Sequence, residues 1–344
     1  MSEQVRSAIA HVMRGGTLGV HEAHAAMSSV MEGEAAPSQL GGMLLALRMR
    51  GESVDELTGF AMAMRERVLA VSAPDGAIDT CGTGGDGSRT FNISTAAALV
   101  VAAAGVPVAK HGNRAMSSAT GSADVLEALG IAIDHSPERA AEVLATDGFA
   151  FLFAPSYHPA MRHAGPVRRE LGVPTAFNLL GPMTNPAGVR RQVIGVADPS
   201  AAAKVAHVLH RLGTERAFVV HGDGVDELPL DGSGVAYDVS RAGVRRRVVD
   251  STSLGLARAT CADLRGGDAA HNAAIIESVL NGETGPRRDV VLLNAGAALL
   301  AAGRARTLRD GIRLAEIAID TGRARALLGR LRQPRAATAR ASAA

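Results

Sequence analysis

Three short polar segments of the chain hold residue types that could bind a phosphorylated substrate. The first, residues 82–87, reads GTGGDG and is followed by FNIST at residues 91–95. Glycines let the backbone approach a phosphate closely, and amides at the start of a helix can donate to an anion. The segment lacks the lysine of a P-loop and the spacing of a dinucleotide fingerprint. On its own, it could equally be a tight turn before a capped helix.

The second segment, KHGNRA at residues 110–115, is basic. It contains Arg114 and Lys110, which is one of only two lysines in the chain. A compact ammonium group and a forked guanidinium group both suit a phosphate. The alternative interpretation is a basic surface turn. Hydroxyl side chains follow the segment at Ser117, Ser118, Thr120 and Ser122.

The third segment is the adjacent acidic pair Asp226 and Glu227, with Asp223 close by in the sequence. Adjacent carboxylates in a loop point apart, so they could bind two ions or approach one ion from two sides. Magnesium prefers a few carboxylates together with water and substrate phosphate. A solvated acidic turn is the common alternative for any Asp-Glu pair.

The N-terminal part of the chain, from residue 7 to about residue 71, has a helical pattern. Apolar residues recur at three- and four-residue spacing, as in residues 40–47. Ser53 lies three residues before Glu56, which is the arrangement of a helix N-cap. We expect a small helical unit here.

After residue 77 the pattern changes to alternating strands and helices. A strand at 77–80 leads into the glycine segment, a helix begins near Thr95, and a strand at 106–109 leads into the KHGNRA segment. This order is typical of an α/β domain. Open α/β sheets bind ligands beyond the carboxyl ends of their strands, so both segments should form loops that face one crevice. Further strands are predicted at 150–153, 192–196 and 217–221, and further helices at 201–212, 272–280, 290–302 and 308–320.

Charge and composition favour a soluble enzyme of the cytoplasm. The formal net charge of +2 gives no case for a nucleic-acid partner. Cys81 and Cys261 lie far apart and fit neither a metal spacing nor a disulfide framework. The longest apolar run, residues 96–109, is too short to span a bilayer, and the polar N-terminus does not read as a signal peptide. We therefore expect no membrane partner.

The order of these motifs resembles that of the anthranilate phosphoribosyltransferases. GTGGDG, FNIST, KHGNRA and GSADVLEALG appear in turn, followed by a long segment at residues 158–186 that ends in FNLLGPMTNP. VDE at 225–227, LRGGDAAHNA and LLNAGAAL continue the match, so the resemblance covers nearly the whole chain. The combination of KHGNRA with FNLLGPMTNP is highly specific. The family shares its fold with the pyrimidine nucleoside phosphorylases.

The resemblance implies an α/β fold with a small N-terminal helical domain and a large domain whose central, mainly parallel sheet is flanked by helices. The helical domain would span residues 1–72 and be joined by part of about 162–188. The phosphoribosyl-binding α/β domain would comprise 73–161 and 189–331. Independently of the resemblance, the small residues and arginines at 332–344 predict a disordered tail. A homodimer through the helical domain is also implied.

The implied reaction transfers the phosphoribosyl group of 5-phosphoribosyl 1-pyrophosphate (PRPP) to the amine of anthranilate, with Mg²⁺ as cofactor, in tryptophan biosynthesis. No covalent nucleophile is expected. Asp226, Glu227 and the hydroxyl of Ser94 would bind the magnesium. Arg168 would meet the anthranilate carboxylate. Gly82, Asn113, His111 and His158 would complete the anthranilate site. The PRPP site would comprise Gly82, Gly85, Asp86, Thr90, Asn92, Ile93, Ser94, Thr95, Lys110, His111, Gly112, Asn113, Arg114, Ala115, Met116, Ser117, Ser118 and Ser122.

Three positions depart from the pattern of the family. Ala119 stands where many relatives carry a lysine. Leu228-Pro229 follows the acidic pair where a β-branched residue and a serine are more usual. Met161 occupies a position that is aromatic in some relatives. Two other functions stay open on the same fold. One is a pyrimidine nucleoside phosphorylase, and the other is a non-catalytic paralogue that binds nucleic acid through a concentrated basic surface.

Overall fold

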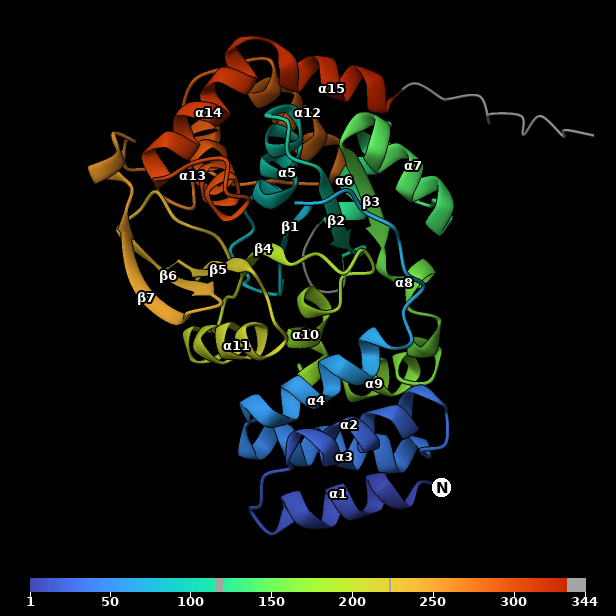
Figure 1. The fold of residues 1–344 in the computed structure, drawn as a ribbon. Helices are drawn as coiled ribbons and strands as arrows, with labels where there is room; N and C mark the ends of the chain where they lie inside the picture. Colours follow the sequence, from blue (N-terminus) through green and yellow to red (C-terminus); the bar gives the residue numbers. More distant parts are fainter. Residues whose placement is uncertain (116–119, 223, 333–344) are drawn as a thin grey trace, which may run out of the picture.

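A single seven-stranded sheet forms the centre of the larger part of the molecule (Figure 1). In this computed structural model, residues 1–115, 120–222 and 224–332 are described. The first five strands pair in parallel, and the last two continue the sheet antiparallel. The strand order is β3-β2-β1-β4-β5-β6-β7. The strands are β1 (Ile78–Gly82), β2 (Val108–Gly112), β3 (Phe149–Phe153), β4 (Arg191–Gly195), β5 (Arg216–His221), β6 (Ser233–Ser240) and β7 (Gly243–Asp250).

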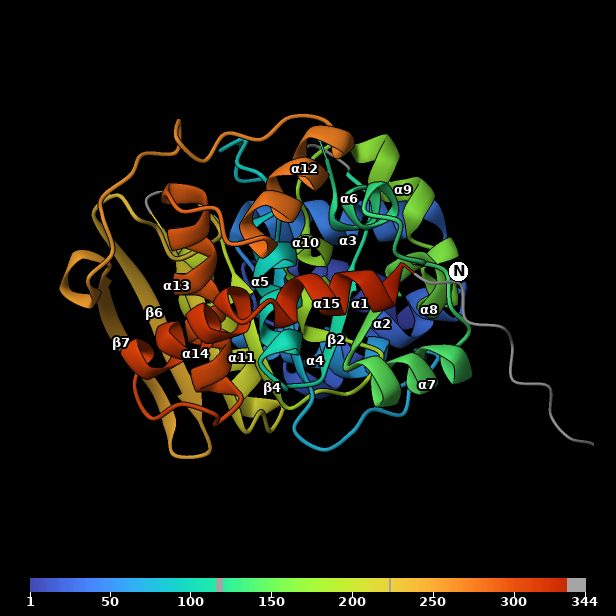
Figure 2. The same ribbon diagram turned by 90° about the horizontal axis from the view of Figure 1, so that it is seen from above.

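Helices cover both faces of the sheet (Figure 2). Side chains alternate between the faces along each strand. Val193 of β4 packs with the helices of one face, whereas its neighbour Ile194 packs with those of the other face. The first face is covered by α5 (Ile93–Ala103), α12 (Ala269–Leu280), α13 (Pro286–Ala301), α14 (Leu308–Asp320) and α15 (Arg323–Leu331). The second is covered by α7 (Pro137–Asp147) and α11 (Pro199–Arg211). The short α6 (Ser122–Ala128) and α8 (Ala154–Tyr157) lie beyond the ends of β2 and β3.

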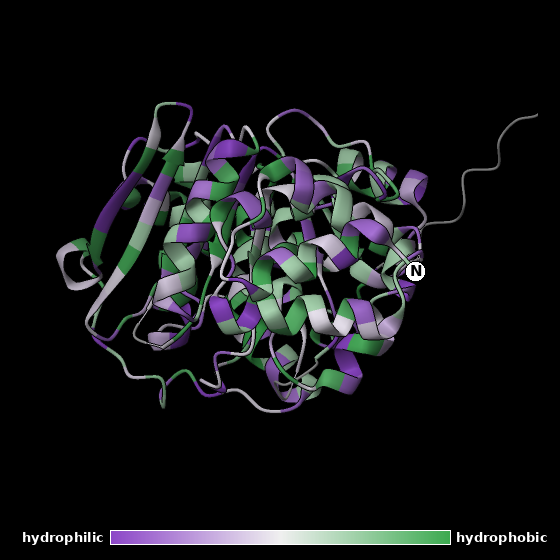
Figure 3. Ribbon diagram, turned by 90° about the horizontal axis from the view of Figure 1, so that it is seen from below, coloured by the Kyte–Doolittle hydropathy of each residue, from purple (hydrophilic) through white to green (hydrophobic). Residues whose placement is uncertain are grey.

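A separate bundle of helices lies below the sheet in Figure 1. The capping box predicted at its fourth helix is present, since Ser53 Oγ accepts from the Glu56 N–H and Glu56 Oε2 accepts from the Ser53 N–H. Two helices from the middle of the chain, α9 (Gly165–Leu171) and α10 (Ala176–Leu180), pack against this bundle. The bundle consists of α1 (Glu3–Met13), α2 (Val20–Met31), α3 (Pro37–Arg50) and α4 (Val54–Arg65). Hydrophobic and hydrophilic bands alternate along many of the helices, as amphipathic helices require (Figure 3).

The sequence pattern predicted one strand at shifted positions and did not predict two others. The strand predicted at 106–109 is β2 at Val108–Gly112, so Lys110 lies inside a strand and not in a loop, which corrects the prediction. β6 and β7 were not predicted. β7 reads GVRRRVVD and is exposed along its centre. An edge strand with a run of arginines does not show the apolar alternation on which strand prediction depends. Helix α15 was likewise not predicted.

The α/β class, the helical N-terminal unit and the mainly parallel sheet are confirmed. No helix in the described part of the chain is long and apolar enough to cross a membrane. Within the described residues neither cysteine forms a disulfide; Cys81 is buried and Cys261 is exposed. Beyond Arg332, the predicted tail lies outside the described residues.

Candidate functional site

The carboxyl ends of β1 and β4 form the centre of the candidate site. From β1 the chain continues to β2 and β3 on one side, whereas β4 leads to β5 and the antiparallel strands on the other. Open α/β sheets bind ligands at this kind of reversal in strand order. Gly82 and Gly195, the last residues of β1 and β4, are paired across it.

The acidic segment crosses directly over this pair of glycines. A Cβ atom on Gly82 would overlap the carboxylate of Asp226, and one on Gly195 would overlap its carbonyl oxygen. The N–H of Gly84, in the glycine loop, donates to Asp226 Oδ2 at 2.9 Å. Gly84 itself has a φ of +65°, a conformation that favours glycine. The glycines therefore let two distant segments of sequence meet in the crevice.

Asp226 and Glu227 point to different partners, as expected for adjacent loop residues. Glu227 Oε1 accepts from the N–H of Ser94, the second residue of α5, at 3.0 Å. Burial, and then the negative charge of Asp86, raises the pKa of Asp226 to about 6. Burial and the charge of Asp226 raise the pKa of Glu227 well above its usual value. Two carboxylates are thus held close together in a setting that disfavours their negative charge.

This donor set suits a magnesium ion. A divalent cation would relieve the repulsion between the two carboxylates, and carboxylate and hydroxyl oxygens are the ligands that magnesium prefers. Among the residues at 1–115, 120–222 and 224–332, no group of three or more His, Cys, Asp or Glu side chains gathers as a metal cluster. A magnesium ion bound by Asp226 and Glu227 would still have coordination positions for water and for a substrate phosphate, the other ligands that magnesium usually keeps.

Lys110 lies in the floor of the crevice and not on its surface. It is 1% exposed, and its Nζ donates to the carbonyl oxygen of Thr80 on β1. Its positive charge acts against the rise in the pKa of Glu227 and of Asp79, both of which burial raises. The single lysine of this region is therefore placed to balance buried carboxylates.

Asp79 was not identified from the sequence, although it organises this floor. Burial raises the pKa of its carboxyl to about 6. One oxygen accepts from the main-chain N–H of His111 at 3.2 Å, and the other accepts from Asn185 Nδ2 at 2.8 Å. Asn185 also donates to the carbonyl of Ala109 at 2.8 Å. An ionisable residue, Asp79, within a short run that reads as a buried strand was the signal that could have revealed it.

A pair of buried histidines lies beside these residues. His111 and His158 approach with their Nε2 atoms 3.2 Å apart, and His111 Nδ1 lies 3.1 Å from the carbonyl oxygen of Gly181. Burial lowers the pKa of His111 to about 3 and that of His158 to about 4. Both rings are neutral near pH 7. The two histidines predicted for the acceptor site are therefore brought together, against the FNLLGPMTNP segment.

Asn272, which was not identified from the sequence either, holds the start of α5 through Asn92. The Asn92 side chain donates from Nδ2 to the carbonyl of Thr120 at 3.2 Å and accepts at Oδ1 from Asn272 at 3.0 Å. Asn272 Oδ1 in turn accepts from the N–H of Gly267 at 2.7 Å. At the same helix start, the buried hydroxyl of Thr95 has no hydrogen-bond partner. The LRGGDAAHNA segment thus supports the start of α5, which follows the glycine loop in the chain.

Arg114 and Arg168, the two arginines predicted for the site, contact acidic and aromatic side chains. Arg114 forms ion pairs with Asp124, at 3.0 Å, and with Glu127, and its guanidinium lies 5.6 Å from the ring centre of Phe153. Arg168, on α9, lies over the ring of Phe177 at 5.2 Å. Burial lowers the pKa of Arg168. Within the described ranges, no hydrogen bond joins Arg168 to His111, His158 or Asn113.

The remaining residues predicted for PRPP line the two loops. Asp86 accepts from the N–H and hydroxyl of Ser88, at 3.2 and 2.7 Å, and Ser88 Oγ lies 3.2 Å from Thr90 Oγ1. A Cβ on Gly112 would overlap Ser122 Oγ, which donates to the carbonyl of Asn113 at 3.3 Å. Ala115 donates from its N–H to Asp124 at 3.0 Å. Met116, Ser117, Ser118, Ala119 and Asp223 lie outside the described residues.

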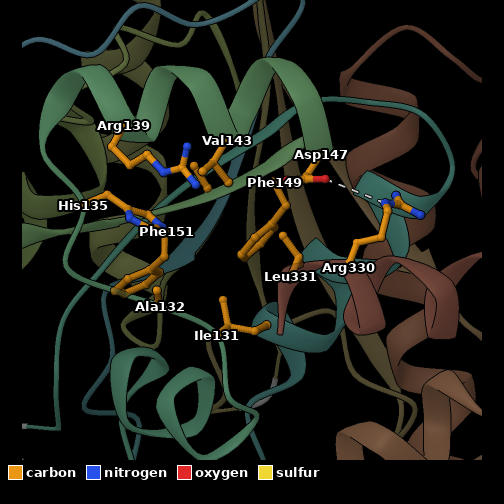
Figure 4. A pocket seen from close by; sticks show the side chains of 11 residues that line it. Ile131, Ala132, His135, Arg139, Val143, Asp147, Phe149, Phe151, Arg330 and Leu331 are labelled. Carbon is orange, nitrogen blue, oxygen red and sulfur yellow. Dashed lines mark ion pairs between the residues drawn. The ribbon is translucent and has the colours of Figure 1, made fainter. Parts of the chain in front are cut away.

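A cavity of about 220 Å³ lies elsewhere, at the amino end of β3 (Figure 4). Arg139 and Asp147 of α7 line it together with Arg330 of α15. The Asp147 and Arg330 side chains lie 3.7 Å apart. Because the strands of the sheet carry the candidate site at their opposite ends, this cavity is separate from the crevice.

The chain matches two parts of one family of proteins. Residues 74–325 match the family described as "Glycosyl transferase family, a/b domain", and residues 6–68 match "Glycosyl transferase family, helical bundle domain". Anthranilate phosphoribosyltransferase from Mesorhizobium japonicum is 52% identical over 327 residues, which is 95% of this chain and 97% of the relative. The enzyme of the same name from Moorella thermoacetica is 53% identical, over 94% of this chain and 96% of the relative.

Solved structures agree with these relatives. The crystal structure of anthranilate phosphoribosyltransferase from Thermus thermophilus is 46% identical, with a TM-score of 0.89 over 94% of this chain and 98% of that chain. Anthranilate phosphoribosyltransferase from Saccharomyces cerevisiae in complex with PRPP and Mg is 26% identical, with a TM-score of 0.87 over 96% and 97%.

Proposed function

Because the chain belongs to the anthranilate phosphoribosyltransferase family, we propose that it transfers the phosphoribosyl group of PRPP to the amine of anthranilate. The products are N-(5-phosphoribosyl)anthranilate and pyrophosphate, in tryptophan biosynthesis. The observation that carries this proposal is the crossing of Asp226 over the paired ends of β1 and β4. It brings the acidic pair and the glycine loop to one crevice.

PRPP binds between the glycine loop and the segment that follows β2. The positive end of the α5 dipole and the unpartnered hydroxyl of Thr95 favour its phosphates there. Buried Lys110 supports this site indirectly, because its positive charge offsets the negative charge of Glu227. The described residues assigned to this site are Gly82, Gly85, Asp86, Thr90, Asn92, Ile93, Ser94, Thr95, Lys110, His111, Gly112, Asn113, Arg114, Ala115 and Ser122.

Magnesium is held by Asp226, Glu227 and the hydroxyl of Ser94. Burial raises the pKa of both carboxyl groups; the charge of Asp86 adds to the rise at Asp226, and the charge of Asp226 adds to it at Glu227. These raised pKa values support the assignment, because a bound cation favours the ionised forms. When bound with PRPP, the ion supplies positive charge against the pyrophosphate. The relative from Saccharomyces cerevisiae, whose complex contains PRPP and Mg, supports the choice of metal.

Anthranilate binds on the side of the histidine pair. Neutral, buried His111 and His158 give a surface that suits a flat aromatic ring, and Arg168 is the cation for its carboxylate. Gly82 and Asn113 complete the site. The Arg168 guanidinium already lies over the ring of Phe177, a contact that favours this position of the side chain.

The chemistry needs little beyond this placement. An aromatic amine is neutral near pH 7, so it can attack C1 of the ribose without a strong base. The residues of the crevice hold the amine against C1, exclude water and stabilise the charge that develops as the C1–O bond to pyrophosphate breaks. This accounts for the lack of a predicted covalent nucleophile.

The test uses the fluorescence of anthranilate. Purified protein with PRPP and Mg²⁺ should consume anthranilate and lose its signal, and a chelator should stop the loss. Lys110→Ala should slow turnover strongly, whereas Lys204→Ala, the only matched lysine in the chain, should not. Phosphorolysis of a pyrimidine nucleoside without anthranilate turnover would instead support the phosphorylase alternative.

Three further assignments belong to this proposal. Residues 1–72, joined by part of 162–188, form the helical domain, and 73–161 with 189–331 form the α/β domain; the packing of α9 and α10 against α3 and α4 supports this division. Met13 and Met49, 76% and 88% exposed on the helical bundle, support a homodimer through that surface. A charged substrate such as PRPP supports a cytoplasmic location.

A further inference from the structure

One buried side chain outside the crevice holds the loop that carries the acidic pair. Asn294 lies in the middle of α13 and is 3% exposed. Its Oδ1 accepts from the N–H of Leu228 at 3.0 Å, and its Nδ2 donates to the carbonyl of Leu228 at 3.1 Å. Leu228 directly follows Glu227. The amide of Asn294 therefore binds both polar groups of the residue next to a proposed magnesium ligand.

Asparagine is suited to this task because its amide resembles a peptide unit. It has one acceptor and two donor hydrogens, and the second donor is satisfied by the carbonyl of Val290 on the same helix, at 2.9 Å. Leucine has a similar volume but can make none of these bonds. Aspartate could accept from Leu228 but, when ionised, could not donate to it.

The helix that carries Asn294 is itself fixed in place. Two residues further on, Gly296 meets Gly311 of α14, and a Cβ atom on either glycine would overlap the backbone of the other helix. Helix α13 also packs against α5, the helix whose second residue, Ser94, donates to Glu227. The two bonds to Leu228 therefore fix the position of the acidic loop relative to the start of α5.

The loop is anchored on its other side by different contacts. Asp226 rests on Gly82 and Gly195 and accepts from Gly84. These contacts locate Asp226, but nothing among them holds the chain after Glu227. The Asn294 bonds supply that constraint.

From these contacts we propose that Asn294 is a positioning residue for the magnesium site: it holds the main chain of Leu228 so that Glu227 stays aligned with Asp226. The inference rests on the proposed function for the identity of the metal ligands. Residues that orient metal ligands from behind typically change metal affinity by about 10- to 100-fold when they are replaced.

The experiment measures divalent-ion binding directly. Mn²⁺ replaces Mg²⁺ as the probe, and the electron paramagnetic resonance signal of free Mn²⁺ is followed as the full chain is titrated in the presence of PRPP. Asn294→Leu and Asn294→Ala should each weaken Mn²⁺ binding by about 10-fold. The Michaelis constant for anthranilate should change by less than about twofold, because α13 packs mainly against α5, α12, α14, β4 and β5, none of which carries a residue assigned to anthranilate.

Leu299→Ala is the matched control. Leu299 is fully buried on the same helix, so its loss should lower the melting temperature without touching the acidic loop. Its Mn²⁺ binding should equal that of the unaltered chain. Equal weakening in Leu299→Ala and Asn294→Ala would overturn the proposal, because general loosening of α13 would then explain both.

Unchanged Mn²⁺ binding in a folded Asn294→Ala would also overturn it, as would failure of both Asn294 variants to fold, which would assign the residue to the core. The proposed function fails separately. If the unaltered chain binds Mn²⁺ with PRPP but leaves anthranilate fluorescence unchanged, the reaction is wrong while the role of Asn294 is still measured.

Discussion

The carboxylates and the arginines of the crevice are held in different ways. Asp226 and Glu227 each accept from a main-chain N–H, and Asp226 also rests on two strand ends. Among the described residues, Arg114 is held by the side chains of Asp124 and Glu127, and it is half exposed. The positions of the carboxylates are therefore fixed by the fold itself. The arginine contacts can be exchanged for the anions of a ligand at small cost.

The largest effect is expected where the main chain fixes the geometry. Asp226→Asn removes a charge that the metal needs while keeping a similar shape, and turnover should fall about 100-fold. Loss of anthranilate fluorescence with PRPP and Mg²⁺ measures it. Asp263→Asn, at an exposed carboxylate, should leave the rate unchanged. A rate within about threefold of normal for Asp226→Asn would remove this residue from the metal site.

A smaller effect is expected at the acceptor cation. Arg168→Ala should raise the Michaelis constant for anthranilate about 10-fold, since a hydrogen bond to a charged group contributes about 1.5–3 kcal/mol. The limiting rate should change little. Arg169→Ala, the exposed neighbour on α9, is the control. An unchanged constant for Arg168→Ala would move the carboxylate of anthranilate to another cation.

Freeing Arg114 should have an effect in the opposite direction. Glu127→Gln removes one of its two acidic partners, so the guanidinium becomes more available to PRPP. Because an exposed ion pair is worth up to about 1 kcal/mol, the Michaelis constant for PRPP should fall by about threefold. Glu142→Gln, which breaks a similar exposed pair with Arg139, should not change it. A higher constant for Glu127→Gln would mean that the pair helps PRPP to bind.

The smallest effect concerns pH. Burial raises the pKa of Asp226 to about 6, so at that pH the Asp226 carboxyl is protonated in about half of the molecules. The Mg²⁺ concentration for half-maximal activity should rise by about twofold between about pH 7.5 and about pH 6. A constant Mg²⁺ requirement over this interval would contradict the burial of the carboxylate.

The same pKa has a consequence for the metal-free protein. The folded pKa of Asp226 is raised by burial above an unfolded value of about 4. The folded state therefore binds more protons between these values, and the contribution of Asp226 to the free energy of unfolding falls as pH rises from about 4 to about 6. Asp226→Asn should flatten this part of the melting-temperature profile.

Much of the fold and the crevice could be read from the sequence, because glycine and strand patterns are local signals. The segments at 82–87 and 226–227 follow strands, and parallel strands bring their carboxyl ends together. The position of Lys110 could not be read in the same way. A lysine is typical of a surface, whereas the charges of Asp79 and Glu227 and the hydrogen bond to the Thr80 carbonyl favour the burial of Lys110.

The supporting residues were missed for a related reason. Asn272 and Asn294 lie near the C-terminus, 180 and 66 residues from the groups that they bond. No local pattern reports such distant pairings, and an asparagine in a helix usually faces solvent. β7 was missed because tertiary pairing with β6 outweighs its run of arginines.

The paired glycines at the ends of β1 and β4 link the crevice to the mechanics of the sheet. β1 and β4 are parallel, but the chain adds further strands to opposite sides of them, β2 and β3 beside β1 and β5 to β7 beside β4. Asp226 lies over the ends of both. A ligand that fixes Asp226 therefore restrains β1 and β4, and the strands beside each, relative to one another. Amide protons of β1 and β4 should consequently exchange more slowly with solvent deuterium once the crevice is filled, far more so than those of β7 at the outer edge.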